Sequence, residues 1–143
     1  MTSQYRALIE QVAAQFGLDG RLLEAQCWQE SSDQADAFRW EPGFYRRYVK
    51  GNAKAKAGQY GPLAACSYGL LQIMLETAVE EGFGGNPWDL FTPAAGLYWG
   101  ARHLARLRDD HAGDMMAALL AFNGGGDPTY ASRVLQREQE LDA

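Results

Sequence analysis

The sequence predicts a mostly helical fold of the α+β kind, in which a helical bundle surrounds one central buried helix and a small β-hairpin lies beside it. Apolar residues recur at steps of three and four from Tyr5 to Phe16, which is the period of an amphipathic helix. The segment Met115–Phe122 is apolar almost all round, as is typical of the central buried helix of a domain. There is room for a small hairpin near residues 60–74. With 143 residues, the chain has the length of one domain, which we place at 1–143.

The first half of the chain predicts two helices followed by a long irregular segment. Gly17 ends the first helix, and Asp19 has a side chain that can cap the start of the second. Residues 36–65 keep no period, because six glycine and proline residues interrupt them, and we expect one helical turn at Phe44–Val49. A loop of this length inside a compact domain indicates a functional segment.

The second half predicts three further helices. Leu75–Glu81 has the pattern of a short helix that ends at Gly82. Thr92-Pro93 places a capping residue before proline at the first helical position, and we expect a long helix from there to about Asp109. Asp127-Pro128 begins the last helix in the same way. Four small residues of the long helix permit close packing: Gly96, Gly100, Ala101 and Ala105.

Composition and charge exclude several classes of function. Apolar residues make up 47% of the chain and charged residues 22%, as in ordinary globular proteins. The net charge is −5 and no basic stripe is visible, so we expect no nucleic-acid partner. No apolar run is long enough to span a membrane, so we expect no membrane insertion, and we expect the protein to be a monomer.

The histidines and cysteines show no spacing typical of metal ligands. His103 and His111 are each isolated, and we expect both to face solvent. Cys27 and Cys66 are expected to be free thiols, with a disulfide between them as the alternative. No P-loop, dinucleotide-binding or Ser/His/Asp pattern is present, and we therefore expect no metal and no cofactor.

Glu30 is the first candidate for chemistry. Together with Leu23 and Cys27 it forms one stripe of the second predicted helix, which is otherwise apolar there. Burial raises the pKa of a carboxyl group, and the negative end of the helix dipole acts in the same direction. Such a group can serve as a general acid near neutral pH. The alternative is a glutamate at a helix end that simply reaches water.

Two amide-bearing strings follow, at Gly69–Gln72 and Ala121–Gly125. The Gln72 amide offers both a donor and an acceptor, which suits a sugar hydroxyl or an acetamido group. Asn123 is followed by three glycines, more than a helix end requires, which suggests that a ligand approaches the backbone closely. Taken singly, each string is explained as well by an ordinary helix entry or helix cap.

Taken in order, Glu30-Ser31, Gly69-Leu70-Leu71-Gln72 and Ala121-Phe122-Asn123-Gly124-Gly125 resemble the motifs of the soluble lytic transglycosylases. That family shares a lysozyme-like fold with the goose-type lysozymes, so the resemblance implies an active-site cleft with the hairpin beside it. The similarity runs from about Leu22 to Leu135. The string Asn123–Tyr130 looks most like phage and prophage versions of the family.

The resemblance implies roles position by position. Glu30 matches the catalytic acid/base of the family, and the hydroxyl of Tyr130 is expected to approach that carboxyl. The positions that match substrate-binding or site-ordering residues are Ser31, Gln72, Met74, Phe122, Asn123 and Tyr130. The chain departs from the family pattern at Leu71, where methionine is common, and at Phe122, where tyrosine is usual. The interval from Glu30 to Gly69 is also longer than usual.

Three functions follow from this resemblance. The first is cleavage of the β-1,4 bond between N-acetylmuramic acid and N-acetylglucosamine in peptidoglycan, with formation of 1,6-anhydro ends. The second is hydrolysis of the same bond, which requires a second carboxylate; the candidates are Asp33, Asp36 and Glu41. The third is a glycan-binding module without catalysis.

The expected setting rests on the N-terminus, which has no signal-peptide pattern. The substrate lies outside the cytoplasmic membrane. We therefore expect a protein that is made in the cytoplasm and acts on the periplasmic cell wall after release or delivery, as a phage endolysin does. A virion-borne or secreted enzyme is the alternative.

Overall fold

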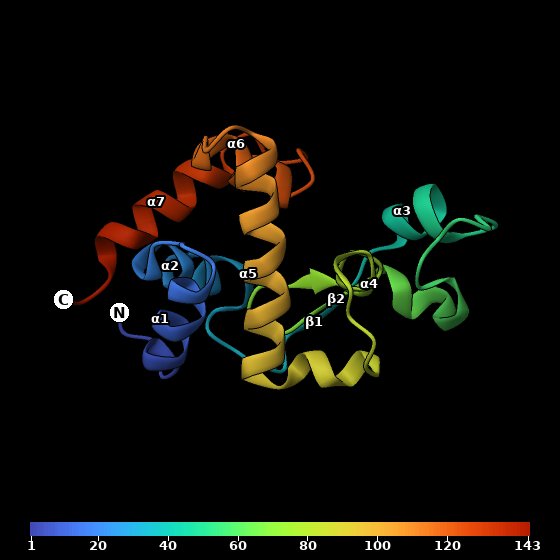
Figure 1. Cartoon of the computed structure of the whole chain (residues 1–143), viewed down its shortest axis with the longest axis horizontal. Coiled ribbons are helices and arrows are strands. Elements are labelled where there is room, and N and C mark those ends of the chain that lie inside the picture. The colour runs from blue at the N-terminus through green and yellow to red at the C-terminus, as the bar shows by residue number, and fades with distance from the viewer.

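The long helix α5 (Pro93–Asp110) runs through the middle of the computed structural model, which describes all residues from Met1 to Ala143. Helices α1 (Arg6–Gln15), α2 (Gly20–Ser31) and α7 (Tyr130–Glu140) lie on one side of it, and the sheet with α4 (Leu75–Glu81) lies on the other (Figure 1). The mostly helical fold with a small sheet is therefore confirmed.

The central position belongs to α5 rather than to α6 (Met115–Phe122), so the predicted place of the central helix was wrong. Only Ala118 and Leu119 of α6 are buried, because Ala121 and Phe122 border a cavity. The buried face of α5 consists of Gly96, Leu97, Gly100, Ala101, Leu104 and Ala105. A Cβ atom on Gly100 would lie 2.6 Å from Cδ1 of Leu71, which confirms that this helix packs closely.

The helix ends follow the local sequence signals. The Asp19 side chain accepts a hydrogen bond from the backbone N–H of Arg21 at 2.9 Å and so caps α2. At the other end of α2, Ser32 has a left-handed conformation with φ of 51° and ends the helix immediately after Ser31. Gly82, with φ of 116°, ends α4 in the same way.

A three-stranded antiparallel sheet lies beside α4 and α5. Its strands are β1 (Phe38–Trp40), β2 (Cys66–Tyr68) and β3 (Ile73–Met74), in that spatial order. The hairpin β2–β3 confirms the prediction for residues 60–74. Gly69 begins its turn with φ of +77°, and a Cβ atom there would lie 2.5 Å from the carbonyl oxygen of Leu90, so only glycine fits.

The segment 36–65 has more regular structure than its sequence predicts. It supplies β1, the strand that the predicted hairpin did not include. After β1 come α3 (Pro42–Phe44), a π-helical turn η1 (Tyr45–Val49) and a 3₁₀ segment η2 (Gly58–Ala65). The predicted turn at Phe44–Val49 is thus confirmed, whereas the loop around it was predicted too broadly. Short 3₁₀ and π elements carry no extended hydrophobic period, which is why the pattern did not reveal them.

Two hydrophobic clusters hold the elements together. The larger one has 20 buried residues and joins α1, α2, α5, α6 and α7. The smaller one has 11 buried residues, most of them in the sheet, η2 and α4. Cys27 lies in the larger cluster and Cys66 in the smaller, and both are free thiols. None of the helices is both long and apolar enough to cross a membrane.

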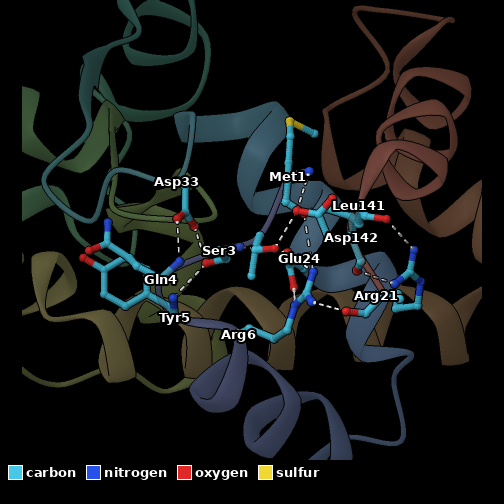
Figure 2. A network of polar contacts seen from close by, with 12 residues as sticks. Met1, Ser3, Gln4, Tyr5, Arg6, Arg21, Glu24, Asp33, Leu141 and Asp142 are labelled. Atoms are coloured by element: carbon cyan, nitrogen blue, oxygen red, sulfur yellow. Dashed lines mark hydrogen bonds and ion pairs between the residues drawn. The ribbon is translucent and has the colours of Figure 1, made fainter.

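The two termini are tied to each other and to α2 by polar contacts (Figure 2). The amino group of Met1 lies 3.1 Å from the Asp142 carboxylate. Arg6 donates to the buried Glu24 carboxylate from Nε at 2.6 Å and from Nη2 at 3.0 Å. Arg21 donates to three carbonyl oxygens of the C-terminal segment, those of Glu138, Leu141 and Asp142. These contacts fix the beginning of α2, while its other end reaches a large cavity.

Candidate active site

The cavity, of about 1140 Å³, lies between the helical part of the molecule and the sheet. Its walls come from the end of α2, from β1 to η1, from the β2–β3 hairpin, from α4 and α5, and from the end of α6. Of the residues selected from the sequence, the structure brings six to this cavity: Glu30, Glu41, Gln72, Met74, Phe122 and Asn123.

Glu30 lies in the last turn of α2 and half-buries its carboxyl group in the cavity wall. The residues one and two turns before it, Cys27 and Leu23, are buried in the larger cluster, as the apolar stripe predicted. The pKa of Glu30 is raised to about 7, chiefly by burial and also by the charge of Glu41, although a hydrogen bond from Tyr130 and the charge of Arg39 lower it. A carboxyl group with this pKa can both donate and accept a proton near neutral pH.

Tyr130 fixes one oxygen of that carboxyl group. Its hydroxyl lies 2.7 Å from Oε2 of Glu30 and donates to it, as the resemblance implied, although Tyr130 itself is buried behind the cavity wall. The fully buried Gln26 in turn donates from Nε2 to the Tyr130 oxygen at 3.2 Å. Because the Tyr130 proton is directed to Oε2, Oε1 remains the oxygen that can exchange a proton with a ligand.

Gln26 was missed by the sequence reasoning, although it gave a signal. It lies one turn before Glu30, at a spacing that places both side chains on one face of α2. A polar residue on a buried helix face needs a hydrogen-bond partner, and the Tyr130 hydroxyl is that partner.

Ser31 does not line the cavity. Its hydroxyl donates to the carbonyl oxygen of Cys27 at 3.0 Å, inside the last turn of α2. We therefore assign Ser31 to ordering the helix end that carries Glu30, rather than to contact with a ligand.

Gln72 and Met74 bring the hairpin to the cavity. Gln72 has a positive φ of 50°, and its Nε2 donates to the carbonyl oxygens of Gly69 and Ala37, both at 3.0 Å. The amide nitrogen is thus used within the protein. The side-chain oxygen of Gln72 remains as an acceptor for a ligand.

Asn123 ends α6 at the cavity and is followed by bare backbone. Gly124 and Gly125 both have positive φ, and a Cβ atom on any of Gly124, Gly125 or Gly126 would meet nothing within 4 Å. Gly124 and Gly126 line the cavity. The triple glycine therefore exposes backbone groups to a ligand, in keeping with the close approach expected from the sequence.

Of the three candidates for a second carboxylate, only Glu41 reaches the cavity, where Arg39 pairs with it at 3.0 Å. Asp33 is buried elsewhere and accepts hydrogen bonds from the Ser3 hydroxyl at 2.6 Å and the Gln4 N–H at 3.2 Å (Figure 2). Asp33 follows the end of α2 and has a positive φ of 63°. Asp36 is exposed and does not line the cavity.

His103 corrects another prediction. It does not face bulk solvent but is half-buried, lines the cavity, and places Nδ1 at 2.7 Å from Oε2 of Glu81. Its partner is 22 positions away in the chain, on α4, so no local pattern could reveal the pair. His111 is exposed, as predicted.

A family model described as the transglycosylase SLT domain matches residues 7–141, almost the whole chain. The protein therefore belongs to this family of lytic transglycosylases, which are murein-degrading glycosidases, as the resemblance of its motifs indicated. No solved structure matches the chain.

Proposed function

We propose that this member of the SLT family cleaves the β-1,4 bond between N-acetylmuramic acid and N-acetylglucosamine and closes a 1,6-anhydro ring on the muramic acid. The observation that carries the proposal is Glu30: one carboxyl group, with its pKa raised to about 7, in the wall of a large cavity. A reaction in which a single group first donates and then accepts a proton needs such a pKa.

Protonated Glu30 donates its proton from Oε1 to the glycosidic oxygen, and the bond to the anomeric carbon breaks. The 2-acetamido group of the substrate stabilises the positive anomeric centre, as in substrate-assisted glycosidases. Ionised Glu30 then accepts the proton of the 6-hydroxyl as that oxygen bonds to the anomeric carbon. No second carboxylate is needed, because the nucleophile is tethered within the substrate. Throughout, the Tyr130 hydroxyl holds Oε2 and favours the ionised state.

The other cavity residues would bind the glycan. The side-chain oxygen of Gln72 can accept from a sugar hydroxyl or an acetamido N–H, and the Asn123 amide can both donate and accept. Met74 and Phe122 offer apolar surface for the sugar faces and the acetyl methyl groups. Phe122 lacks the hydroxyl group of the tyrosine that is usual at this position, so it offers the glycan only its aromatic ring.

The substitution Glu30→Gln tests the proposal, because it keeps the shape of the side chain and removes the acidic proton. On purified murein sacculi we expect the rate of turbidity loss to fall by about 10²- to 10⁴-fold. Glu41→Gln is the matched control in the same cavity, and it should retain most of the activity. Activity of Glu30→Gln at the level of the unsubstituted protein would refute the assignment.

Hydrolysis of the same bond is the second candidate, and it is favoured by the presence of Glu41 in the cavity with Glu30. An inverting glycosidase uses a second carboxylate to activate water. Arg39 pairs with the Glu41 carboxylate and so competes with water for it. For this reason we rank hydrolysis second. Mass spectrometry of the released muropeptides separates the two: anhydro ends are lighter by one water than reducing ends.

As a biological setting we propose phage-encoded lysis, which is supported by the similarity of the Asn123–Tyr130 string to phage and prophage versions of the family. Expression of the chain in the bacterial cytoplasm should then be harmless, whereas the same chain with an added export signal should lyse the cells. Lysis by the chain without an export signal or a membrane-opening partner would count against this setting.

A further inference from the structure

The buried carboxylate of Glu81 determines how His103 is protonated. The Glu81 side chain is 3% exposed, and its Oε2 accepts a hydrogen bond from Nε of Arg106 at 2.6 Å. Burial raises the pKa of Glu81, but the hydrogen bonds from His103 and Arg106 outweigh it and lower the pKa below its usual value. The group is therefore a carboxylate at neutral pH, and the nearby Nδ1 of His103 carries the proton that points to it.

The second ring nitrogen of His103 is then an acceptor. Burial lowers the pKa of His103; Glu81 and Asp110 raise it and Arg106 lowers it, and the balance leaves it below its usual value. A neutral imidazole holds one proton, which lies on Nδ1, so Nε2 has a free lone pair. No protein group donates a hydrogen bond to Nε2. Nε2 is also not one of the fully buried side-chain atoms that lack a partner, so it is not sealed off from a ligand.

The surroundings of His103 suit an uncharged ligand. The ring lies 5.6 Å from the ring of Phe122, centroid to centroid, and lines the cavity with Thr77 and Asn123. Arg106, the cation that lowers the pKa of His103, is itself bound to Glu81. An acceptor beside an aromatic ring and an amide is complementary to the O–H and N–H donors of a sugar, whose apolar face can lie on the aromatic ring.

We propose that Nε2 of His103 binds the glycan by accepting a hydrogen bond from a sugar hydroxyl or acetamido N–H, with Glu81 holding the ring in the accepting tautomer. The site lies on the α4–α5 wall of the cavity that contains Glu30. The identity of the ligand as an N-acetylated glycan rests on the proposed function. The geometry of the Glu81–His103 pair does not.

Two substitutions separate binding by His103 from packing. His103→Asn places an amide nitrogen near the position of Nδ1, so it keeps the contact with Glu81 and loses the acceptor at Nε2. His103→Gln extends an amide to the position of Nε2 and loses the contact with Glu81. We expect His103→Asn to raise the half-saturating murein concentration by about two- to tenfold, the usual worth of one hydrogen bond, with the maximal rate and the Tm unchanged.

His103→Gln should show the reverse, with half-saturation near that of the unsubstituted protein and a lower Tm. A purely structural role for His103 predicts that both variants change the Tm and that neither changes half-saturation. That result would overturn the proposal, as would a fall in maximal rate alone for His103→Asn.

Binding without turnover identifies the donor on the sugar. In the Glu30→Gln protein, affinities are measured by calorimetry for two sugars, tetra-N-acetylchitotetraose and cellotetraose. Cellotetraose has a hydroxyl group at each carbon 2, where the first sugar has an acetamido group. Loss of affinity for the first sugar alone on adding His103→Asn assigns the acetamido N–H, and equal loss for both assigns a hydroxyl. Unchanged affinity for both, or no binding of either sugar by Glu30→Gln, would overturn the proposal. Failure of the proposed reaction would appear separately, as the absence of murein cleavage by the unsubstituted protein.

Discussion

The two ends of helix α2 treat a carboxyl group in opposite ways. At the end beside the chain termini, Glu24 is buried with a side chain 3% exposed, and it accepts from Arg6 at 2.6 Å and from the Ser3 N–H at 2.9 Å (Figure 2). Burial raises its pKa, but these hydrogen bonds and the charge of Arg6 lower it below the usual value. At the cavity end, Glu30 has the neutral Tyr130 as its donor, and burial prevails.

Burial alone therefore does not decide the protonation of a carboxyl group in this helix. The charge of its donor matters too: the Arg6 guanidinium helps to lower the pKa of Glu24 below its usual value, whereas the neutral Tyr130 hydroxyl leaves the pKa of Glu30 raised to about 7. One helix thus carries an anion that holds the fold together and an acid that can do chemistry.

The largest effect on stability is expected from Arg6→Met, which leaves Glu24 buried without its cation. We expect the Tm at pH 7 to fall by roughly 5–10 °C. The pKa of Glu24 is lowered in the folded state, so its contribution to stability is present above the unfolded-state pKa and is lost as pH falls through the folded-state pKa. The difference from the unsubstituted protein should therefore shrink in acid.

Lys54→Met is the matched control for Arg6→Met, because Lys54 is exposed and forms no ion pair. It should leave the Tm within about 1 °C. Equal thermal curves for Arg6→Met and Lys54→Met at pH 7 would mean that the Arg6–Glu24 pair does not stabilise the fold.

Glu30→Gln should have the opposite effect on stability. The pKa of Glu30 is raised from 4.5 to about 7, so the folded state loses stability relative to an uncharged side chain as pH rises through this range. At about 1.36 kcal/mol per pKa unit, the gain from Glu30→Gln is on the order of 3 kcal/mol at pH 8 and near zero at pH 4. Denaturant unfolding at the two pH values measures it, and a gain that does not depend on pH would mean that ionisation of Glu30 is not its cause.

The pH dependence of activity is the third expected effect. Cleavage needs the protonated form of Glu30, so kcat/KM should decline above pH about 7. Tyr130→Phe removes a hydrogen bond that lowers the pKa of Glu30, and the decline should therefore move to higher pH. An unchanged profile in Tyr130→Phe would mean that the hydroxyl does not act on the carboxyl group in solution.

The sequence predicted those parts of the molecule that depend on local pattern. Helix caps such as Asp19, the closely packed Gly100 and the apolar stripe that carries Glu30 all follow from spacing within one or two turns. The motifs also sufficed to predict the family and to place Gln72 and Asn123 at the same cavity as Glu30.

What the sequence did not predict depends on contacts between distant elements. Asp33 and Glu41 lie eight positions apart, yet only Glu41 lies in the cavity, because Ser3 and Gln4 bind Asp33. His103 and Glu81 meet only because α4 packs on α5. The segment 36–65 folds through contacts with the sheet and with the smaller hydrophobic cluster. Its own sequence has no periodicity that predicts these contacts.

The smallest effect, and the finest test of the cavity end of α2, is expected from Gln26→Met. Gln26 is fully buried and donates to Tyr130, while its own Oε1 has no hydrogen-bond partner. Methionine has nearly the same volume, so the substitution removes the donor to Tyr130 and also an unsatisfied buried acceptor. We therefore expect the Tm to stay equal or rise.

Without the donor from Gln26, the Tyr130 hydroxyl is less firmly directed to Oε2 of Glu30, and the pKa of Glu30 should rise slightly. The decline of kcat/KM should then move to higher pH by a few tenths of a unit, in the same direction as in Tyr130→Phe and by less, since the Tyr130 hydroxyl is still present. Gln29→Met, on the same helix but bonded to Arg137, is the control and should not move the profile. A lower Tm with an unmoved profile would instead make Gln26 a packing residue, and the chain of hydrogen bonds to Glu30 would then begin at Tyr130.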